Sequence, residues 1–404
     1  MSTAAERDVV SLVEPHYDRM ITFCQRCIQT PSLPGEEGDF AALVKAEMEL
    51  LGYDEVWTDE WGNVVGLLRG RGSGRSVMFN GHLDHVDPGS ADDWPYPPYG
   101  GELHDGRLWG RGVADMKGPL AAMLYAVGVL AQEGIRPPGD VYVVGVVQEE
   151  VGGLGTQKLL QTVTPDVAVV GEATSNQLAR GHRGRIEVVA RVRGKSVHAS
   201  VPEQGVNPHA VVARVVQGLE KLPLAQDETF GSSSVAPTLY LTDQKSSNVI
   251  PGEARLHLDW RNVPGETAEE VLAQLQPLLE ACMAEVKGSH GELELHTRDL
   301  RTYTGRTETF PAVFPSFGLE ADHPLVRKGR QVLESALSSP VEVVIWRFAT
   351  DGGHLMEAGV PTIGFGPAEA RELHTVGESV PLEMLKEGML GYLALAMALG
   401  EGDT

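Results

Sequence analysis

The period of the hydrophobic pattern changes near residue 180 and again near residue 300 of this 404-residue chain. Before and after these points, short runs of β-branched residues alternate with amphipathic helical segments. Between them, strands with one polar and one apolar face dominate, which is typical of half-exposed sheets. The pattern therefore predicts two domains, one formed by residues 1–180 and 300–404 and one by residues 181–299, which are inserted into the first.

In the first stretch, strands and helices follow one another at the spacing of βαβ units. The expected helices cover residues 8–29, 37–51, 119–133 and 154–163. The expected strands cover residues 55–58 and 63–68 and three apolar runs that begin at Ser76, Asp140 and Asp166. After the insertion, strands are expected at 341–346 and 361–365 and a helix at 381–399. The fold class of this domain is thus α/β, with a mostly parallel sheet.

The middle stretch has a different order of elements. Strands are expected at residues 185–192, 238–241, 253–260 and 292–296, and helices at 207–222 and 267–286. This order is β-α-β-β-α-β, which is that of a ferredoxin-like α+β domain. Such a domain has one sheet face to bury and little of its own chain to cover it, so it favours contact with a second copy.

Composition excludes several classes of protein. With 42% hydrophobic and 22% charged residues the chain is globular, and its net charge of -23 argues against nucleic-acid or anionic-membrane partners. Three cysteines form no disulfide framework, and Cys24 and Cys27 fit a packed helix face better than a redox or zinc site. The N-terminus lacks signal-peptide organisation, and the longest apolar helix, near 389–399, is too short to span a bilayer. We therefore expect a cytoplasmic protein.

Ionisable residues gather where the three apolar runs of the first stretch end. They are His82 and Asp84 after the first run, Asp115 in the loop that follows, Glu149 and Glu150 after the second run, and Glu172 after the third. The carboxyl ends of parallel strands form the ligand-binding edge of an open α/β sheet. Carboxylates brought together there repel one another and resist burial, and a pair of divalent cations removes both problems. Separate solvated loop residues are the less favoured alternative for the whole set.

With these residues in view, the chain resembles the di-zinc amidohydrolase and peptidase family of acetylornithine deacetylase, succinyl-diaminopimelate desuccinylase, aminoacylase and the glutamate carboxypeptidases. The resemblance extends from Pro31 to His374. The matching motifs are Gly-His-x-Asp at 81–84, Gly-Arg-Gly-x-x-Asp-x-Lys-Gly at 110–118, Glu-Glu at 149–150, Gly-Glu at 171–172 and His-Thr at 374–375.

The resemblance implies a role for each metal ligand. Asp115 would bridge two metals, with His374 and Glu150 completing one site and His82 and Glu172 the other. The implied ions are two divalent cations, zinc before cobalt or manganese. His and carboxylate ligands agree with zinc.

Three further residues of this domain are singled out. Glu149 is the implied general base. Asp84 would accept the far N–H of His82 and fix its tautomer. His85 departs from the family pattern, and a packed histidine is favoured there over an additional polar wall of the site.

In the insertion, the resemblance implies that His198 supplies a hydrogen bond to the reaction's oxyanion across a homodimer interface. Asn248 and Arg261 would hold the carboxylate of the substrate. Without the resemblance, His198 is more simply structural, and a surface ion pair is the alternative for Arg261.

The implied function is hydrolysis of an amide bond in an N-acyl amino acid, as in the deacetylases and desuccinylases. A dipeptidase or exopeptidase acting on a short peptide is the alternative within enzymes. A non-catalytic metal-binding scaffold is the alternative outside them, and Glu149 argues against it because a pure binder needs no acid that binds no metal.

Overall fold

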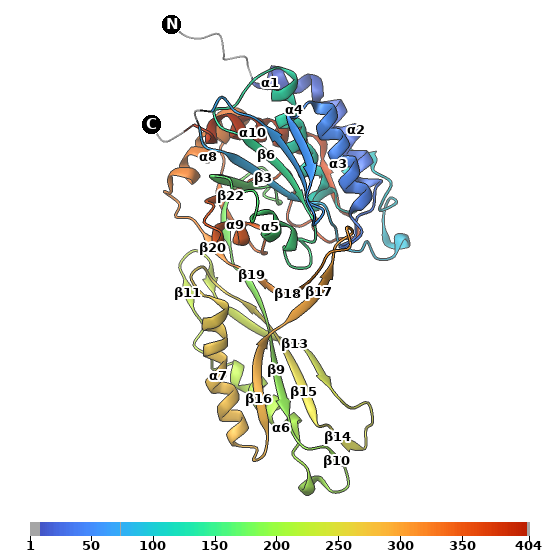
Figure 1. Ribbon diagram of the computed structural model, residues 1–404, viewed down its shortest axis with the longest axis vertical. Helices are drawn as coiled ribbons and strands as arrows, with labels where there is room; N and C mark the ends of the chain where they lie inside the picture. The colour runs from blue at the N-terminus through green and yellow to red at the C-terminus, as the bar shows by residue number, and fades with distance from the viewer. Residues whose placement is uncertain (1–8, 73, 402–404) are drawn as a thin grey trace.

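The computed structural model describes residues 9–72 and 74–401, so the N-terminal segment that we expect to lack a signal lies outside the described residues. The molecule is elongated and has two lobes (Figure 1). Both ends of the chain form the upper lobe and the middle of the chain forms the lower lobe. The predicted domain boundaries fall within β8 (Leu178–His182) and β17 (Thr297–Arg301), and we keep them as a proposal.

The upper lobe is built on a nine-stranded sheet in the order β1-β2-β6-β3-β7-β22-β8-β20, with β21 paired to β8. In addition to β8, its strands are β1 (Glu55–Thr58), β2 (Val64–Leu68), β3 (Val77–His82), β6 (Val141–Val146), β7 (Val167–Val170), β20 (Phe317–Gly318), β21 (Val343–Trp346) and β22 (Thr362–Gly364). The central strands β6, β3, β7 and β22 are parallel. They read as near-continuous apolar runs because helices cover both faces. The predicted α/β class with a mostly parallel sheet is confirmed.

Helices cover this sheet on both sides. They are α1 (Val9–Val13), α2 (Tyr17–Ile28), α3 (Gly38–Leu51), α4 (Gly118–Gln132), α5 (Leu154–Leu159), α8 (Pro324–Leu337), α9 (Gly352–Glu357) and α10 (Leu382–Leu399), with short turns η1 (Glu14–His16), η2 (Ala91–Asp93) and η3 (Val113–Lys117). The single helix expected over residues 8–29 is interrupted at η1, where Pro15 has no N–H to continue the helical hydrogen bonds. The helix expected over residues 154–163 ends at Leu159.

Among the described residues, Val113–Gln132 is the helical segment that is long and apolar enough to cross a membrane, whereas the sequence suggested 389–399 as the longest apolar helix. It is 20 residues long with a mean hydropathy of 1.3, which is enough to cross a membrane by length and composition. All of its apolar window is buried inside the protein, so it is a core helix. α10 packs against it.

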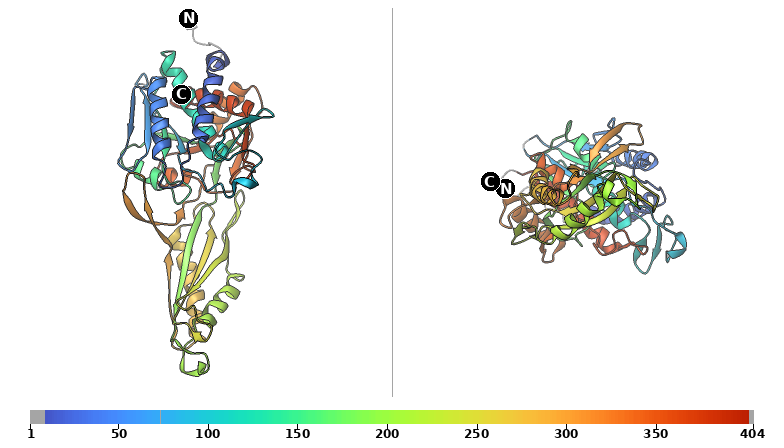
Figure 2. Two further views of the ribbon diagram at one scale, coloured as in Figure 1. Left: turned by 90° about the vertical axis from the view of Figure 1, so that its right-hand side faces the viewer. Right: turned by 90° about the horizontal axis from the view of Figure 1, so that it is seen from below.

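The lower lobe has the predicted β-α-β-β-α-β order. Its elements are β9 (Arg185–Arg193), α6 (Pro208–Leu219), β13 (Ser234–Thr242), β15 (Glu253–Arg261), α7 (Ala268–Ala284) and β16 (His290–Leu295). The strands are antiparallel in the order β13-β15-β9-β16. Alternate residues of β9 such as Val188 and Val192 are buried in a core that both helices share. The lobe extends away from the upper lobe and narrows toward its tip (Figure 2).

Smaller strands complete the structure. They are β4 (Glu102–His104), β5 (Arg107–Trp109) and β23 (Ser379–Pro381) in the upper lobe, and β10 (Val197–His198), β11 (Gln226–Asp227), β12 (Gly231–Ser232), β14 (Val249–Ile250) and β19 (Val313–Phe314) in the lower lobe.

A hairpin of β17 and β18 (Thr307–Pro311) connects the lobes. The hydroxyl of Tyr303 at its tip donates to the carbonyl of Gly62, 2.9 Å away. The side-chain amide of Gln148 donates to the carbonyl of Arg301 at 2.8 Å. The hairpin therefore contacts the upper lobe directly beside Glu149.

Candidate metal centre and active site

The sheet brings the predicted ligands to one edge. His82 is the last residue of β3, and it pairs in parallel register with Val146, the last residue of β6. Glu149 and Glu150 lie in the turn after β6, and Glu172 follows β7. The remaining two ligands come from loops: Asp115 from η3 and His374 from the segment before β23.

The carboxylate of Asp115 lies between two sets of ligand atoms. Its Oδ1 is 2.8 Å from Nε2 of His82, and its Oδ2 is 3.0 Å from Nε2 of His374. His82 Nε2 is also 3.3 Å from Glu172, and His374 Nε2 is 3.2 Å from Glu150. The structure thus brings together, on either side of Asp115, the residues that the family resemblance grouped as two ligand sets, and their binding of metal stays a prediction.

The residues present fit divalent cations. Donor atoms of His82, Asp115 and Glu150 lie within 4.8 Å of one another. Those of His82, Glu149 and Glu172 do so as well, which places Glu149 directly beside the ligands His82 and Glu172. Oε2 of Glu172 is buried without a hydrogen-bond partner. Burial and the charge of Asp115 raise the pKa of both Glu150 and Glu172. The carboxylates of Asp115, Glu149, Glu150 and Glu172 lie together beside two imidazoles, and bound cations would relieve their mutual repulsion.

Glu149 lies on the wall of a cavity at this centre. The cavity has a volume of about 190 Å³, and its lining consists of Asp115, Glu149, Glu150, Glu172, Phe348, Ala349, Ala370, Leu373 and His374. Burial raises the pKa of Glu149 well above its usual value, and the charges of Asp351, Glu172 and Glu150 act in the same direction. Glu149 is therefore a buried acid that faces the space between the ligands.

Asp84 differs from its predicted role. Nδ1 of His82 is 2.9 Å from the backbone carbonyl oxygen of Asp84, but 3.6 Å from its carboxylate. The carboxylate instead accepts hydrogen bonds from the backbone amides of Glu149 and Glu150, each at 3.0 Å. The backbone of Asp84 thus fixes the tautomer of His82, and its side chain holds the turn that carries the two glutamates.

Sequence reasoning missed Glu378 and Arg111. The buried carboxylate of Glu378 accepts hydrogen bonds from the backbone amides of Gly112, Ala114 and Asp115 at 3.0, 2.8 and 3.2 Å. Arg111 pairs with the same carboxylate at 2.7 Å. Glu378 therefore holds the Asp115 loop from the segment that also carries His374. Its signal in the sequence is weak, because the groups that hold its carboxylate belong to a loop that is far from it along the chain.

We expect Glu378→Gln to weaken metal binding by about 10- to 100-fold, as is usual for groups that orient metal ligands. The amide keeps only one acceptor oxygen for the loop and leaves the buried Arg111 without its counter-charge. The measurement is metal affinity by competition with a chromophoric chelator, alongside a thermal melt. The control is Glu369→Gln, which removes a partly exposed ion pair with Arg107. Equal metal affinity of Glu378→Gln and the parent would contradict a positioning role.

The three predicted residues of the insertion lie elsewhere. His198 is exposed in β10, at the tip of the lower lobe that points away from the upper lobe (Figure 1), and Nδ1 of its ring accepts from the amide of Ser200 at 3.1 Å. Pairing of β10 with β14 places Asn248 beside it, and the carbonyl of Asn248 accepts from the amide of Ala199 at 2.8 Å. The lobe does not bring either residue to the Asp115 site of the same chain.

Arg261, at the end of β15, donates to Asp259 at 2.6 Å. The ion pair that the sequence analysis gave as the alternative role of Arg261 is therefore present. Contact of Arg261 with a substrate stays a prediction.

The histidine and cysteine interpretations agree with the structure. Nε2 of His85 accepts from the amide of Ser32 at 3.0 Å, and Nδ1 donates to the carbonyl of Val86 at 2.8 Å. Burial lowers the pKa of His85 to about 4, as expected for a packed neutral ring. Cys24 and Cys27 are free and buried on α2.

Comparison with known proteins adds to this geometry. Residues 78–398 match the model of peptidase family M20/M25/M40. The chain is 30% identical to the uncharacterized protein YgeY of Escherichia coli over 365 residues, 89% of each chain. It is 32% identical to acetylornithine deacetylase of Myxococcus xanthus over 332 residues, 80% of each chain.

Solved structures share the fold. Aminopeptidase PepT of Bacillus cereus superposes with a TM-score of 0.76 at 20% identity, over 95% of this chain and 99% of that one. The YxeP protein of Bacillus subtilis, described as a dinuclear metal binding peptidase, gives a TM-score of 0.73 at 15% identity, over 96% and 99% of the two chains.

Proposed function

Because the chain belongs to peptidase family M20/M25/M40, whose named relatives act on amide bonds, we propose that it removes the acyl group from an N-acyl amino acid. The observation that carries this proposal is the position of Asp115 between two ligand sets, with Glu149 beside them. The deacylase choice is supported by the identity to acetylornithine deacetylase over most of the chain.

The residues around Asp115 would hold two divalent cations. His82 and Glu172 would bind one, His374 and Glu150 the other, and Asp115 both. Imidazole and carboxylate ligands favour zinc, with cobalt and manganese as alternatives. When bound, such a pair lowers the pKa of water and polarises the carbonyl group under attack.

Glu149 would move the proton. Its neighbour Glu150 is used as a ligand, so Glu149 is left free to take a proton from the attacking water and hand it to the leaving amine. Its buried place on the cavity wall, beside both ligand sets, suits this task.

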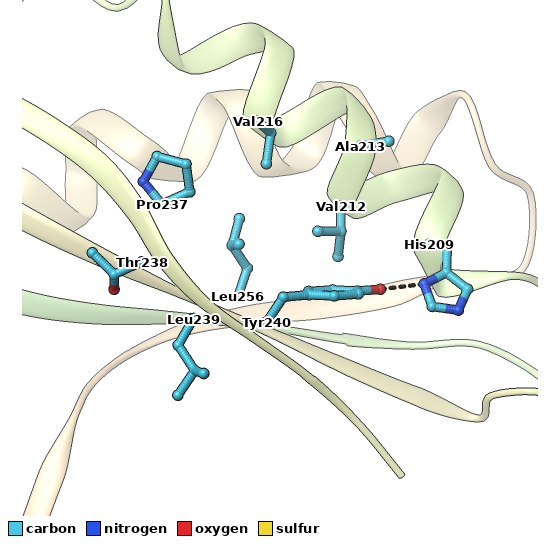
Figure 3. Close-up of a pocket in the computed structure, with 9 residues that line it drawn as sticks. All are labelled: His209, Val212, Ala213, Val216, Pro237, Thr238, Leu239, Tyr240 and Leu256. Atoms are coloured by element: carbon cyan, nitrogen blue, oxygen red, sulfur yellow. Dashed lines mark hydrogen bonds between the residues drawn. The ribbon is translucent and has the colours of Figure 1, made fainter. Parts of the chain in front are cut away.

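The lower lobe would form a homodimer. β13 is an edge strand of its sheet, and Leu239, Tyr240 and Leu241 on it are 48%, 40% and 45% exposed. Figure 3 shows a groove between β13 and α6, where Tyr240 lies beneath the helix and hydrogen-bonds His209, while Leu239 points to the opposite face. Apolar side chains on both faces of an open edge suit pairing with a second copy of the chain.

In such a dimer, His198 would act on the partner subunit. Its place at the tip of the lower lobe, away from the metal centre of its own chain, supports action on another chain over action on its own (Figure 1). There it would donate a hydrogen bond to the oxyanion, and Asn248 and Arg261 would bind the substrate carboxylate.

A cytoplasmic location is part of the same proposal. It is supported by the three cysteines, which are free and buried.

The test is a panel of N-acyl amino acids and dipeptides, offered to the protein after chelator treatment and addition of Zn²⁺, Co²⁺ or Mn²⁺. We expect turnover only with metal, and the highest kcat/KM for an N-acyl amino acid. Glu149→Gln protein prepared in parallel controls for contaminating hydrolases. Higher kcat/KM for dipeptides would replace the deacylase with a peptidase, and failure to turn over any amide would refute the enzymatic proposal.

A further inference from the structure

A second group of metal-ligand side chains lies on the lower lobe. Glu187 of β9 and His257 of β15 project from the sheet face opposite α6 and α7, and His296 follows β16 directly. The backbone fixes the third residue, because the amide of His296 donates to the carbonyl of Glu187 at 2.8 Å. Three neighbouring segments of one sheet thus contribute one side chain each.

The donor atoms of these side chains have the spacing of a metal site. Oε1 of Glu187 is 3.2 Å from Nδ1 of His257 and 3.8 Å from Nε2 of His296. One donor atom from each residue lies within 4.8 Å of the other two. Tetrahedral zinc with bonds of about 2.1 Å separates its ligand atoms by about 3.4 Å, so small side-chain movements suffice.

The neighbouring charges favour the metal-binding form of the carboxylate. Arg298 and Arg185 lie beside Glu187 and stabilise its ionised form, which is the form that binds a metal ion.

The neighbouring arginines contact one oxygen of Glu187 and leave the other to the histidines. Arg298 and Arg185 lie 2.9 and 3.7 Å from Oε2, which leaves Oε1 directed at the two histidines. Arg185 is itself paired with Asp259 at 2.7 Å, so part of its charge is compensated. Hydrogen-bonded carboxylates of this kind are common among metal ligands.

We infer that Glu187, His257 and His296 bind a third divalent cation of the zinc type, separate from the Asp115 centre. Two imidazoles and one carboxylate leave one tetrahedral position for water. The ion would link β9 and β15 to His296, the residue directly before the β17–β18 hairpin. The first strand of that hairpin ends at Arg301, whose carbonyl accepts a hydrogen bond from Gln148. The site therefore lies where the lower lobe is joined to the turn that carries Glu149.

The test uses Co²⁺, which reports four-coordination by its visible absorption. The protein used is the full chain with His82→Ala and Asp115→Ala, which removes two ligands of the Asp115 centre. The result therefore does not depend on whether the proposed function is correct. We expect one Co²⁺ per chain, displaced by Zn²⁺, and loss of this binding when His257→Ala and His296→Ala are added. His290→Ala, an exposed histidine of β16 in the same sheet, is the matched control and should retain binding.

A milder variant guards against misfolding. In the otherwise unchanged chain, His296→Gln at a part-exposed position should lower zinc bound at saturation by one ion and leave the thermal melt without added metal unchanged. Absence of Co²⁺ binding in the folded background protein, or binding that survives loss of both histidines, would overturn the inference. Unchanged zinc content of His296→Gln would overturn it as well.

Discussion

Replacing Glu149 with Gln should lower kcat by about 10²- to 10⁴-fold, the usual effect of losing a general base. Bound metal should stay at the parental level, because the proposed ligands of both cations are unchanged. The amide has nearly the same volume, and the hydrogen bond from the backbone of residue 149 to Asp84 is preserved. Steady-state kinetics and elemental analysis of the same preparation measure the two quantities.

Glu150→Gln is the matched comparison, since it makes the same chemical change one residue later in the same turn. Its backbone amide also binds Asp84, so the turn is equally supported. Here the carboxylate lies 3.2 Å from His374, and we expect loss of metal as well as activity. Equal metal content in the two variants would show that the roles of the neighbouring glutamates are wrongly assigned.

Mixing two inactive variants should restore activity. A dimer of His198→Ala with Glu149→Gln contains one site in which an intact Glu149 meets the intact His198 of the partner subunit. Removing an oxyanion donor costs about 10²- to 10³-fold in kcat, so each variant alone starts from a low background. With free exchange of subunits at equal amounts, half of the dimers are mixed, and activity should approach about a quarter of the parental value.

The matched control is a mixture of Glu149→Gln with Glu150→Gln, in which both defects lie at the centre formed by one chain. Neither site of that mixed dimer is complete, so activity should stay at the background. Mixed dimers are verified by mass spectrometry of differently tagged chains. If such dimers form with His198→Ala and activity does not rise, His198 does not act across the interface.

Much of the fold could be predicted because local signals agree with the tertiary structure. The helix expected over residues 37–51 spans Gly38–Leu51 and ends at Gly52, whose left-handed backbone suits glycine. Thr267 and Glu270 form the capping box that starts α7 where the pattern placed it. β3, which ends at His82, and β7, which Glu172 follows, are recognisable as apolar runs in the sequence, so both residues are expected at one edge of the sheet.

The contacts that sequence missed depend on tertiary pairing. Nothing near Glu378 indicates that its carboxylate enters the Asp115 loop, since the pairing of β23 with β5 determines this. The acceptor for His82 was predicted to be the carboxylate of Asp84, but the backbone carbonyl of the same residue lies closer to Nδ1, at 2.9 Å against 3.6 Å. The first helix is interrupted at Pro15, although the amphipathic pattern continues across that residue.

The position of β22 has a consequence for the synthesis of the protein. This strand belongs to the last part of the chain, yet it lies between β7, which precedes the insertion, and β8, in which the insertion begins. While the ribosome is still synthesising the insertion, β7 and β8 have been made but β22, the strand between them, has not. The proposed ligand His374 has not been synthesised at that stage either. The four-stranded sheet of the lower lobe is complete earlier, so the nascent chain acquires it before the catalytic sheet can close.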